Sequence, residues 1–317
     1  MKKQKIGAIR WDAWVGDANP VGLEVENTLS NPKYKNRLPF YSKMEGDSLK
    51  IRCTDKDTIR KEIEYASTYG IDYFAFCWYP NNSGLDIARK IFLEINQNTL
   101  KWCLILGTNP FTLDDADWLI KEFSKESYLK IDNRPVIYLF NVNSSLLEIV
   151  NYLRANSNYK PYFVGLVWNF KQAKEAKKIF DLDALSQYST PGQNNISYKE
   201  LGEQERNRWQ EYLNIAKVVP WVTSGWDKRP RFEFPVSWEN CQNFDKEYIE
   251  FPTMDELKLE LESAIDFALK NASDLILIYA WNEFDEGGFI APTLNNKSIN
   301  LEKLKSIREV IDKKFEI

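Results

Sequence analysis

Histidine is absent from this chain of 317 residues. Its absence excludes Ser-His and Cys-His nucleophile systems, HExxH zinc sites and imidazole general bases. Proton transfer near neutral pH would then use carboxylates, tyrosine, lysine or cysteine. Cysteine is scarce as well: Cys53, Cys77, Cys103 and Cys241 show no metal-type spacing, and Cys77 and Cys103 lie in apolar, strand-like runs. We therefore expect buried free thiols.

Long apolar segments are also missing. The N-terminal stretch reaches Arg10 and Asp12 after a few apolar residues, and no segment approaches the roughly 20 apolar residues of a membrane span. We therefore expect a cytoplasmic protein with no membrane partner. The net charge is -4 and both signs are interspersed, so no basic stripe is available to bind nucleic acid.

Aromatic residues, in contrast, are abundant. They make up 14% of the chain and include eleven tryptophans, many of them at the ends of strand-like runs. Sugar-binding clefts use such rings as stacking platforms, because the C–H faces of a pyranose are apolar while its edges carry hydroxyls. The structural alternative is that a large core simply holds many aromatic rings.

Short apolar runs alternate with amphipathic segments along the chain. The strand-like runs lie at residues 5–12, 72–79, 101–108, 135–141, 162–168, 183–188, 218–224 and 275–281. The helical patterns lie at residues 57–70, 84–96, 114–126, 144–156, 170–181, 197–216, 253–270 and 300–314. Eight strands and eight helices predict an α/β fold, a (β/α)₈ TIM barrel that forms a single domain over residues 1–317. An open doubly wound sheet would carry a GxGxxG loop after the first strand, and residues 7–17 contain none.

Two connections are too long to be plain turns. They span residues 13–56 after the first strand and 225–252 after the seventh. Both follow the carboxyl end of a strand, which is the face where barrel enzymes build their sites. We expect the two connections to wall a cleft.

Three carboxylates, Glu283, Asp285 and Glu286, follow the eighth strand directly, and Gly287 and Gly288 come next. Like charges held close together raise one another's pKa, so that one acid and one base can coexist. Cleavage of a glycosidic bond requires such a pair. The glycines would let the backbone turn sharply enough to aim both glutamates into one cleft. The alternative is a solvated acidic loop that closes the barrel.

Three segments resemble known carbohydrate-active proteins. Residues 281–293 (WNEFDEGGFIAPT) are similar to the last-strand signature of WbsX-type proteins and of glycoside hydrolase family 99. Residues 224–231 (SGWDKRPR) resemble the WbsX-type GWDNxxR motif after strand seven, and residues 128–138 (YLKIDNRPVIY) resemble the segment that leads into strand four. The three segments occur in the same order and at the same strands as in those proteins.

The resemblance implies a (β/α)₈ fold and, for the hydrolase family, an endo-acting, retaining α-mannosidase reaction without metal; we expect no cofactor. It implies that Glu283 removes the proton of the sugar 2-hydroxyl, so that O2 attacks the anomeric carbon and forms a 1,2-anhydro sugar. Glu286 would protonate the leaving group and later activate water. The chain departs from the family at Asp285, where the hydrolases have histidine, and at residues 107–111, where WbsX-type proteins carry a WANENW-like run.

Polar and aromatic residues at the other strand ends would complete a cleft for hydroxyl recognition and ring stacking. With Glu283 and Glu286 as the catalytic pair, the substrate-binding candidates are Asp12, Trp14, Trp78, Tyr79, Asn109, Tyr138, Trp168, Tyr188, Trp226, Asp227, Arg229, Trp281, Asn282 and Asp285. Each has a structural alternative: Trp168 could belong to the core, Asp12 could cap a helix or pair with an arginine, and Arg229 could be a loop charge.

The predicted function is a retaining, metal-independent glycoside hydrolase whose partner is an α-linked oligosaccharide or polysaccharide; mannose is the sugar that the family resemblance implies. One alternative is a WbsX-type glycosyltransferase of surface-polysaccharide biosynthesis. The other is a non-catalytic glycan-binding barrel. The sugar, the linkage, endo versus exo action and the oligomeric state stay open at this point.

Overall fold

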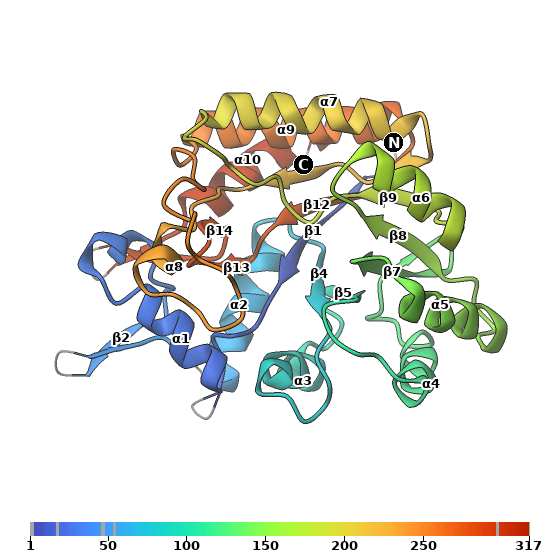
Figure 1. Ribbon diagram of the computed structural model, residues 1–317, viewed down its shortest axis with the longest axis horizontal. Coiled ribbons are helices and arrows are strands. Elements are labelled where there is room, and N and C mark those ends of the chain that lie inside the picture. Colours follow the sequence, from blue (N-terminus) through green and yellow to red (C-terminus); the bar gives the residue numbers. More distant parts are fainter. Residues whose placement is uncertain (1–2, 17–18, 46–47, 53–54, 296–297, 317) are drawn as a thin grey trace.

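The computed structural model describes residues 3–16, 19–45, 48–52, 55–295 and 298–316. A parallel sheet at its centre has the strand order β10-β9-β8-β7-β5-β4-β1-β12-β11. The strands are β1 Lys5–Arg10, β4 Tyr73–Cys77, β5 Lys101–Leu106, β7 Arg134–Phe140, β8 Tyr162–Leu166, β9 Ala184–Ser186, β10 Lys217–Val218, β11 Trp221–Thr223 and β12 Leu275–Tyr279 (Figure 1).

The sheet closes on itself through β10 and β11, which are two parts of one barrel strand. β10 pairs with β9 and β11 pairs with β12, both in parallel. Between them, the Val219 amide donates to the Leu185 carbonyl at 2.9 Å, and the Pro220 carbonyl accepts from the Leu277 amide at 3.0 Å. Proline has no N–H to donate and interrupts the ladder. Counted this way, eight strands of the described residues form the barrel, and the predicted (β/α)₈ fold is confirmed.

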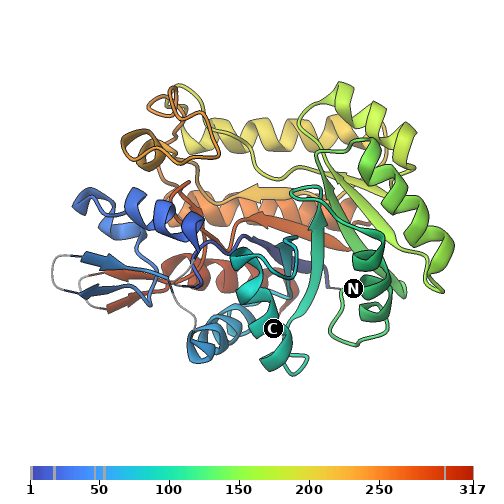
Figure 2. The same ribbon diagram turned by 60° about the horizontal axis from the view of Figure 1, so that its bottom comes forward.

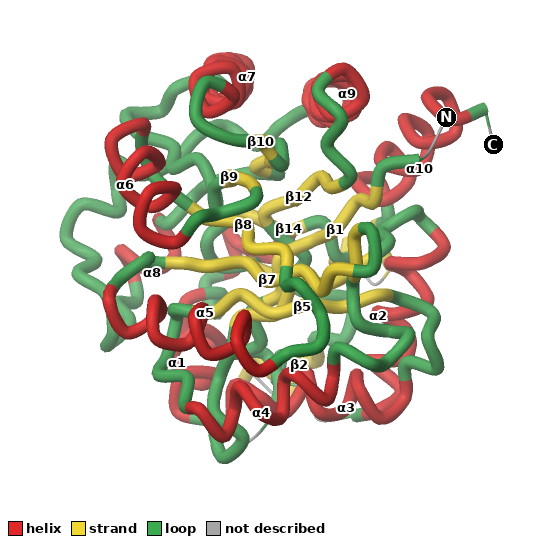
Figure 3. The backbone as a smooth tube through the Cα atoms, turned by 90° about the vertical axis from the view of Figure 1, so that its right-hand side faces the viewer, coloured by secondary structure: helices red, strands yellow, loops and turns green. Residues whose placement is uncertain are grey.

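Helices surround the strands, with α7 and α9 side by side along one edge of the view and α3, α4 and α5 opposite (Figures 1 and 3). The outer helices are α2 Lys56–Thr68, α3 Ile87–Ile95, α4 Leu113–Glu122, α5 Ser144–Asn156, α6 Phe170–Phe180, α7 Tyr198–Leu213, α9 Met254–Lys270 and α10 Glu302–Phe315. Three of them begin with capping boxes, at Thr112, Ser197 and Thr253. A capping box satisfies the free amides of the first turn, which explains why these helices start there.

The barrel strands are almost wholly buried, as expected for a parallel sheet covered on its faces by helices. Inside the barrel, the hydroxyls of Tyr73 and Tyr138 lie 2.8 Å apart. Tyr73 requires a glycine beside it, because a Cβ added at Gly7 would lie 2.1 Å from its ring. Cys77, Cys103 and the loop residue Cys241 are buried free thiols, as predicted.

The two long connections contain structure of their own, which the sequence pattern did not predict. After β1 come α1 Pro20–Thr28, the 3₁₀ helix η1 Pro32–Arg37 and the hairpin β2 Lys43–Glu45 with β3 Ser48–Lys50; after β11 comes α8 Arg229–Glu233. The connections contact each other, since the Tyr34 hydroxyl donates to Glu233 at 2.9 Å. Figure 2 shows α1 and the β2–β3 hairpin projecting to one side of the barrel.

The remaining elements are short: η2 Gly84–Asp86, β6 Lys130–Ile131, β13 Asn282–Glu283, β14 Gly288–Phe289, β15 Thr293–Asn295 and β16 Ser298–Asn300. Most predicted strands extend a residue or two too far at their carboxyl ends, because those residues leave the sheet and form the rim of the barrel. Cys53 lies outside the described residues. Within the described ranges, no helix has both the length and the apolar character needed to cross a bilayer.

Candidate active site

A cleft of about 480 Å³ opens at the carboxyl ends of the barrel strands. Residues that follow β1, β4, β5, β7, β9, β11 and β12 all contribute to it. The cleft is lined by Trp11, Val21, Cys77, Tyr79, Leu85, Thr108, Asn109, Phe140, Asn141, Tyr188, Arg231, Ser237, Trp238, Glu239, Glu283 and Glu286. Val21 belongs to the first long connection, and Arg231, Ser237, Trp238 and Glu239 belong to the second, so both connections contribute to its walls.

Glu283 and Glu286 enter the cleft from the small hairpin of β13 and β14, in which Glu283 pairs with Gly288. The turn needs its two glycines. Gly287 has a φ of +78°, and a Cβ there would lie 2.9 Å from the amide nitrogen of Asp227. A Cβ at Gly288 would lie 2.0 Å from the ring of Tyr279. The chain can therefore bend tightly enough to direct both glutamates to the same side.

Glu286 is held by positive charge. Its Oε1 atom accepts a hydrogen bond from Nη1 of Arg231 and lies 3.3 Å from Nζ of Lys228. Its Oε2 atom accepts a hydrogen bond from the hydroxyl of Tyr279. These donors favour the ionised carboxylate over the neutral acid.

Glu283 lies in a less polar environment. Its Oε1 atom accepts a hydrogen bond from the hydroxyl of Tyr188 at 3.0 Å. Its Oε2 atom is buried and has no hydrogen-bond partner within the part of the chain that the structure describes. The ring of Tyr188 lies 5.5 Å from that of Tyr279, so two packed tyrosines connect the two glutamates.

These surroundings separate the two pKa values. Burial raises the pKa of Glu283 well above its usual range, and the charge of Glu286 raises it further. Burial also opposes ionisation of Glu286, but Arg231 and Lys228 outweigh it and lower the pKa of Glu286 to about 2. The surroundings therefore favour the protonated form of Glu283 and the ionised form of Glu286. This order is the reverse of the one that the family resemblance implies.

Arg231 and Lys228 bridge a group of three carboxylates. Besides Glu286, Arg231 donates to Oδ2 of Asp285 at 2.7 Å and to Oε2 of Glu239 at 2.6 Å. Lys228 donates to Oε1 of Glu239 at 2.8 Å. Asp285 is fully buried and does not line the cleft, but its charge pairs with Arg231 and contributes to the raised pKa of Glu283.

A buried polar network lies beneath the glutamates. The Trp281 indole donates to Glu62 at 3.0 Å, and Arg10 connects Glu62 at 2.7 Å with Asp12 at 2.9 Å. The Asn282 side chain donates to Asp12 at 3.2 Å and accepts a hydrogen bond from the backbone amide of Trp11, directly after β1. The network joins the start of the β13–β14 hairpin to β1 and so positions Glu283.

Of the other predicted residues, only Tyr79, Asn109 and Tyr188 line the cleft. The rest do not line it. Trp168 is half-buried and the Arg229 side chain is 42% exposed. The others are buried: Asp12, Trp14, Trp78, Tyr138, Trp226, Asp227, Trp281, Asn282 and Asp285. The Trp78 indole, for example, donates to the carbonyl of Pro110 at 3.1 Å, and Trp168 packs edge-on against Phe140. Strand ends place side chains alternately toward the cleft and away from it.

Asp227 holds the connection after β11 against the turn between β13 and β14. Its carboxylate binds both Arg37 and Arg229, and its amide donates to the Glu286 carbonyl at 2.6 Å. Burial opposes its ionisation, but the two arginines lower its pKa below the usual value. The neighbouring Trp226 packs on the ring of Tyr279 at 5.6 Å.

The sequence pattern does not single out Arg231, Trp238, Glu239 or Phe140 as cleft residues. Trp238 and Glu239 lie in the long connection after β11, whose length predicts a wall but not which side chains face inward. Only folding brings Arg231 beside Glu286, 55 positions later in the sequence.

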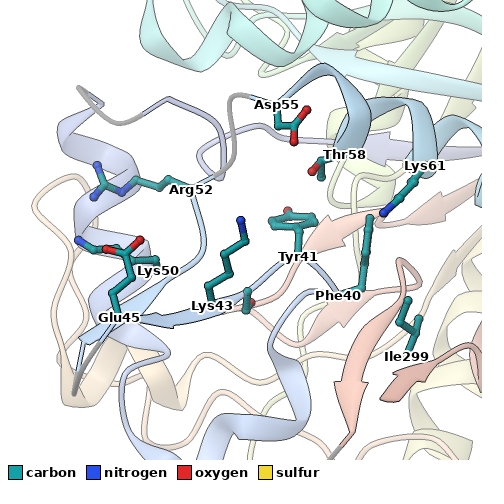
Figure 4. Close-up of a pocket in the computed structure, with 11 residues that line it drawn as sticks. Phe40, Tyr41, Lys43, Glu45, Lys50, Arg52, Asp55, Thr58, Lys61 and Ile299 are labelled. Atoms are coloured by element: carbon teal, nitrogen blue, oxygen red, sulfur yellow. The ribbon is translucent and has the colours of Figure 1, made fainter. Parts of the chain in front are cut away.

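A second cavity of about 760 Å³ lies between the β2–β3 hairpin, the start of α2 and β16 (Figure 4). It is larger than the cleft, but no residue lines both. Its walls carry four cationic side chains, Lys43, Lys50, Arg52 and Lys61, against Glu45 and Asp55. Within the described ranges, no three His, Cys, Asp or Glu side chains are grouped so that they could hold a metal ion.

Comparison with known proteins identifies the fold. No protein-family profile and no curated protein sequence matches the chain. Two solved structures of a family GH99 endo-α-mannosidase from Bacteroides thetaiotaomicron do match it. The first, in complex with bis-tris propane, has a TM-score of 0.62 and 12% identity over 100% of this chain and 99% of that one. The second has a TM-score of 0.60 and 13% identity over 99% and 98%. The chain therefore has the family-99-like (β/α)₈ fold that its motifs predict.

Proposed function

We propose that this protein is a glycoside hydrolase that cleaves an α-linked oligosaccharide or polysaccharide with retention, without metal, using Glu283 and Glu286 as its catalytic pair. One observation carries the proposal: both carboxylates line the same cleft, in surroundings that favour opposite protonation states. Glycosidases need such a division between a proton donor and an anionic partner. The aromatic rings of Trp11, Tyr79 and Trp238 in the same cleft suit a sugar substrate.

The electrostatics lead us to exchange the roles that the resemblance implies. Glu283 would donate its proton to the leaving glycosidic oxygen. The Glu286 carboxylate would take the proton of the sugar 2-hydroxyl while O2 attacks the anomeric carbon. In the second step, the Glu283 carboxylate would take a proton from water, the resulting hydroxide would open the 1,2-anhydro ring, and Glu286 would return its proton to O2.

The substrate class to test first is the α-mannoside, because the two similar structures are those of an endo-α-mannosidase. The experiment is a hydrolysis screen of α-linked mannosides and other glycans, with NMR of the anomeric configuration of the first product. We expect release of a product that keeps the α configuration, and loss of that release in Glu283→Gln and Glu286→Gln.

Three results would contradict the proposal. Unchanged turnover in Glu286→Gln would show that the two glutamates are not the catalytic pair. Transfer from a sugar nucleotide without any hydrolysis would identify a glycosyltransferase. Tight glycan binding without turnover, retained when both glutamates are replaced, would identify a non-catalytic binding barrel.

A further inference from the structure

Trp238 and Glu239 stand at the mouth of the cleft, on the connection after β11. Trp238 is a large apolar side chain with 39% of its area exposed, and it lines the cleft. Its ring lies 6.1 Å from that of Trp11 at an angle of 54°, and the guanidinium of Arg231 lies 5.6 Å from its centre. An indole held against a second indole and a cation leaves part of its surface free for a ligand ring.

Glu239 is a carboxylate held in a fixed orientation. Lys228 donates to its Oε1 atom at 2.8 Å and Arg231 donates to its Oε2 atom at 2.6 Å. A carboxylate has about four acceptor positions, so roughly half of them stay available after these two bonds. The side chain is 29% exposed and lines the cleft, so the available positions can be reached from it.

The connection that carries the two residues is anchored on both sides. The Ser237 hydroxyl, next to Trp238, donates to Glu24 on α1 at 2.9 Å. Behind the pair, Val236, Cys241 and Phe244 form a small buried apolar cluster. Such anchoring lowers the entropy lost when a ligand binds, so the pair is preorganised.

From this arrangement we infer that Trp238 and Glu239 form a sugar-binding subsite at the cleft mouth, which takes an uncharged pyranose with two free neighbouring hydroxyls. The apolar face of the ring stacks on Trp238, and the two hydroxyls donate to the oxygens of Glu239. The ligand is uncharged because Glu239, Asp285 and Glu286 already outnumber Arg231 and Lys228, so an acidic sugar would be repelled. The inference rests on the proposed function for the nature of the ligand.

The test is a binding measurement in the Glu283→Gln background, where an amide replaces a protonated acid and the ligand is not consumed. The probes are α-linked methyl mannobiosides, their monodeoxy analogues on the non-reducing ring, and a glucuronic-acid disaccharide. Isothermal titration gives Kd for the parent, for Trp238→Ala and for Glu239→Gln. The matched controls are Phe234→Ala and Glu250→Gln, which change an exposed ring and an exposed carboxylate of the same connection that do not line the cleft.

We expect each of the two cleft variants to raise Kd about tenfold or more, and the controls to leave it unchanged. The loss in Glu239→Gln should disappear with a deoxy analogue that lacks one of the paired hydroxyls, which a purely structural role of Glu239 would not produce. Three results overturn the inference: no saturable binding of any neutral probe, an equal loss with all analogues, or tighter binding of the acidic sugar. Hydrolysis is measured separately in the wild-type protein, so failure of the proposed function stays distinguishable from failure of the subsite.

Discussion

Two pairs of buried glutamates can be compared in this barrel. Glu283 and Glu286 lie in the cleft, whereas Glu205 on α7 and Glu260 on α9 lie between two outer helices, both almost completely buried. Glu205 accepts a hydrogen bond from the Thr223 hydroxyl at 2.5 Å. Burial, reinforced by Glu260, raises the pKa of Glu205 to about 8, and burial raises that of Glu260 to about 7 despite the nearby Arg206.

The pKa values of Glu205 and Glu260, the helix pair, therefore both shift upward. Those of Glu283 and Glu286, the cleft pair, shift in opposite directions. The difference comes from Arg231 and Lys228, which lower the pKa of Glu286, whereas burial and the charge of Glu286 raise the pKa of Glu283. Neither Glu205 nor Glu260 lines the cleft. A shifted pKa alone therefore does not distinguish the two pairs, whereas opposite pKa shifts beside an open cleft do, and the proposed assignment depends on that difference.

The largest expected effect tests the cleft pair against the helix pair directly. Glu283→Gln and Glu286→Gln should each lower kcat about 10²–10⁴-fold, because each removes one proton-transfer group. Glu205→Gln should leave kcat unchanged. Release of reducing sugar from the best glycan of the screen measures all three, and equal losses in the three variants would show that the comparison carries no information about catalysis.

Replacing the cations tests what divides the cleft pair. Arg231→Met should lower kcat/KM about 10²-fold, because Glu286 loses a donor that keeps it ionised. Arg206→Met, which removes the cation beside Glu260, should not affect hydrolysis. Circular dichroism checks that both variants are folded. If Arg206→Met lost as much activity as Arg231→Met, the separation of the pKa values of Glu283 and Glu286 would not explain hydrolysis.

The pH dependence of hydrolysis tests which of the two glutamates donates the proton and which acts as the base. Glu283 must keep its proton, and Glu286, with a pKa of about 2, stays ionised at all but very low pH. The rate kcat/KM should therefore be highest on the acidic to neutral side and fall about tenfold per pH unit above the raised pKa of Glu283. A rate that instead rises as Glu283 ionises would support the roles that the family resemblance implies.

The smallest expected effect concerns stability at the helix pair. In the folded protein Glu205 has a pKa of about 8 against a usual value of 4.5, so the folded state favours its protonated form. Its contribution is fully present below the usual pKa and is lost as the pH rises toward 8. Glu205→Gln cannot ionise, so its unfolding free energy relative to wild type should rise by more than about 1.4 kcal/mol between acidic and alkaline buffer. Urea unfolding at both pH values measures this, and a constant difference would argue against a raised pKa.

Most of the secondary structure could be predicted because its signals are local. The run LILIY at β12 is apolar throughout, as buried parallel strands are, and residues 254–270 repeat with helical period after the capping residue Thr253. The elements in residues 13–56 were not predicted. Helix α1 and the β2–β3 hairpin are short, and such elements depend on packing against the rest of the fold.

The candidate site could be predicted only in part. The position of Glu283 and Glu286 after the last strand follows from the strand pattern, because a (β/α)₈ barrel brings all strand ends to one face. The direction of a side chain at a strand end is harder to predict, since a shift of one residue reverses it. Tyr79 therefore lines the cleft while its neighbour Trp78 is buried against Phe111.

By itself, the sequence determined the alternation of strands and helices, the absence of histidine chemistry and the presence of two glutamates at the end of the eighth strand. Only the tertiary structure decided in which direction the pKa of each glutamate shifts. That choice depends on Arg231 and Lys228, which come from a different connection and reach Glu286 through space. Electrostatic interaction depends on distance and burial, and neither quantity can be read from the order of residues along a chain.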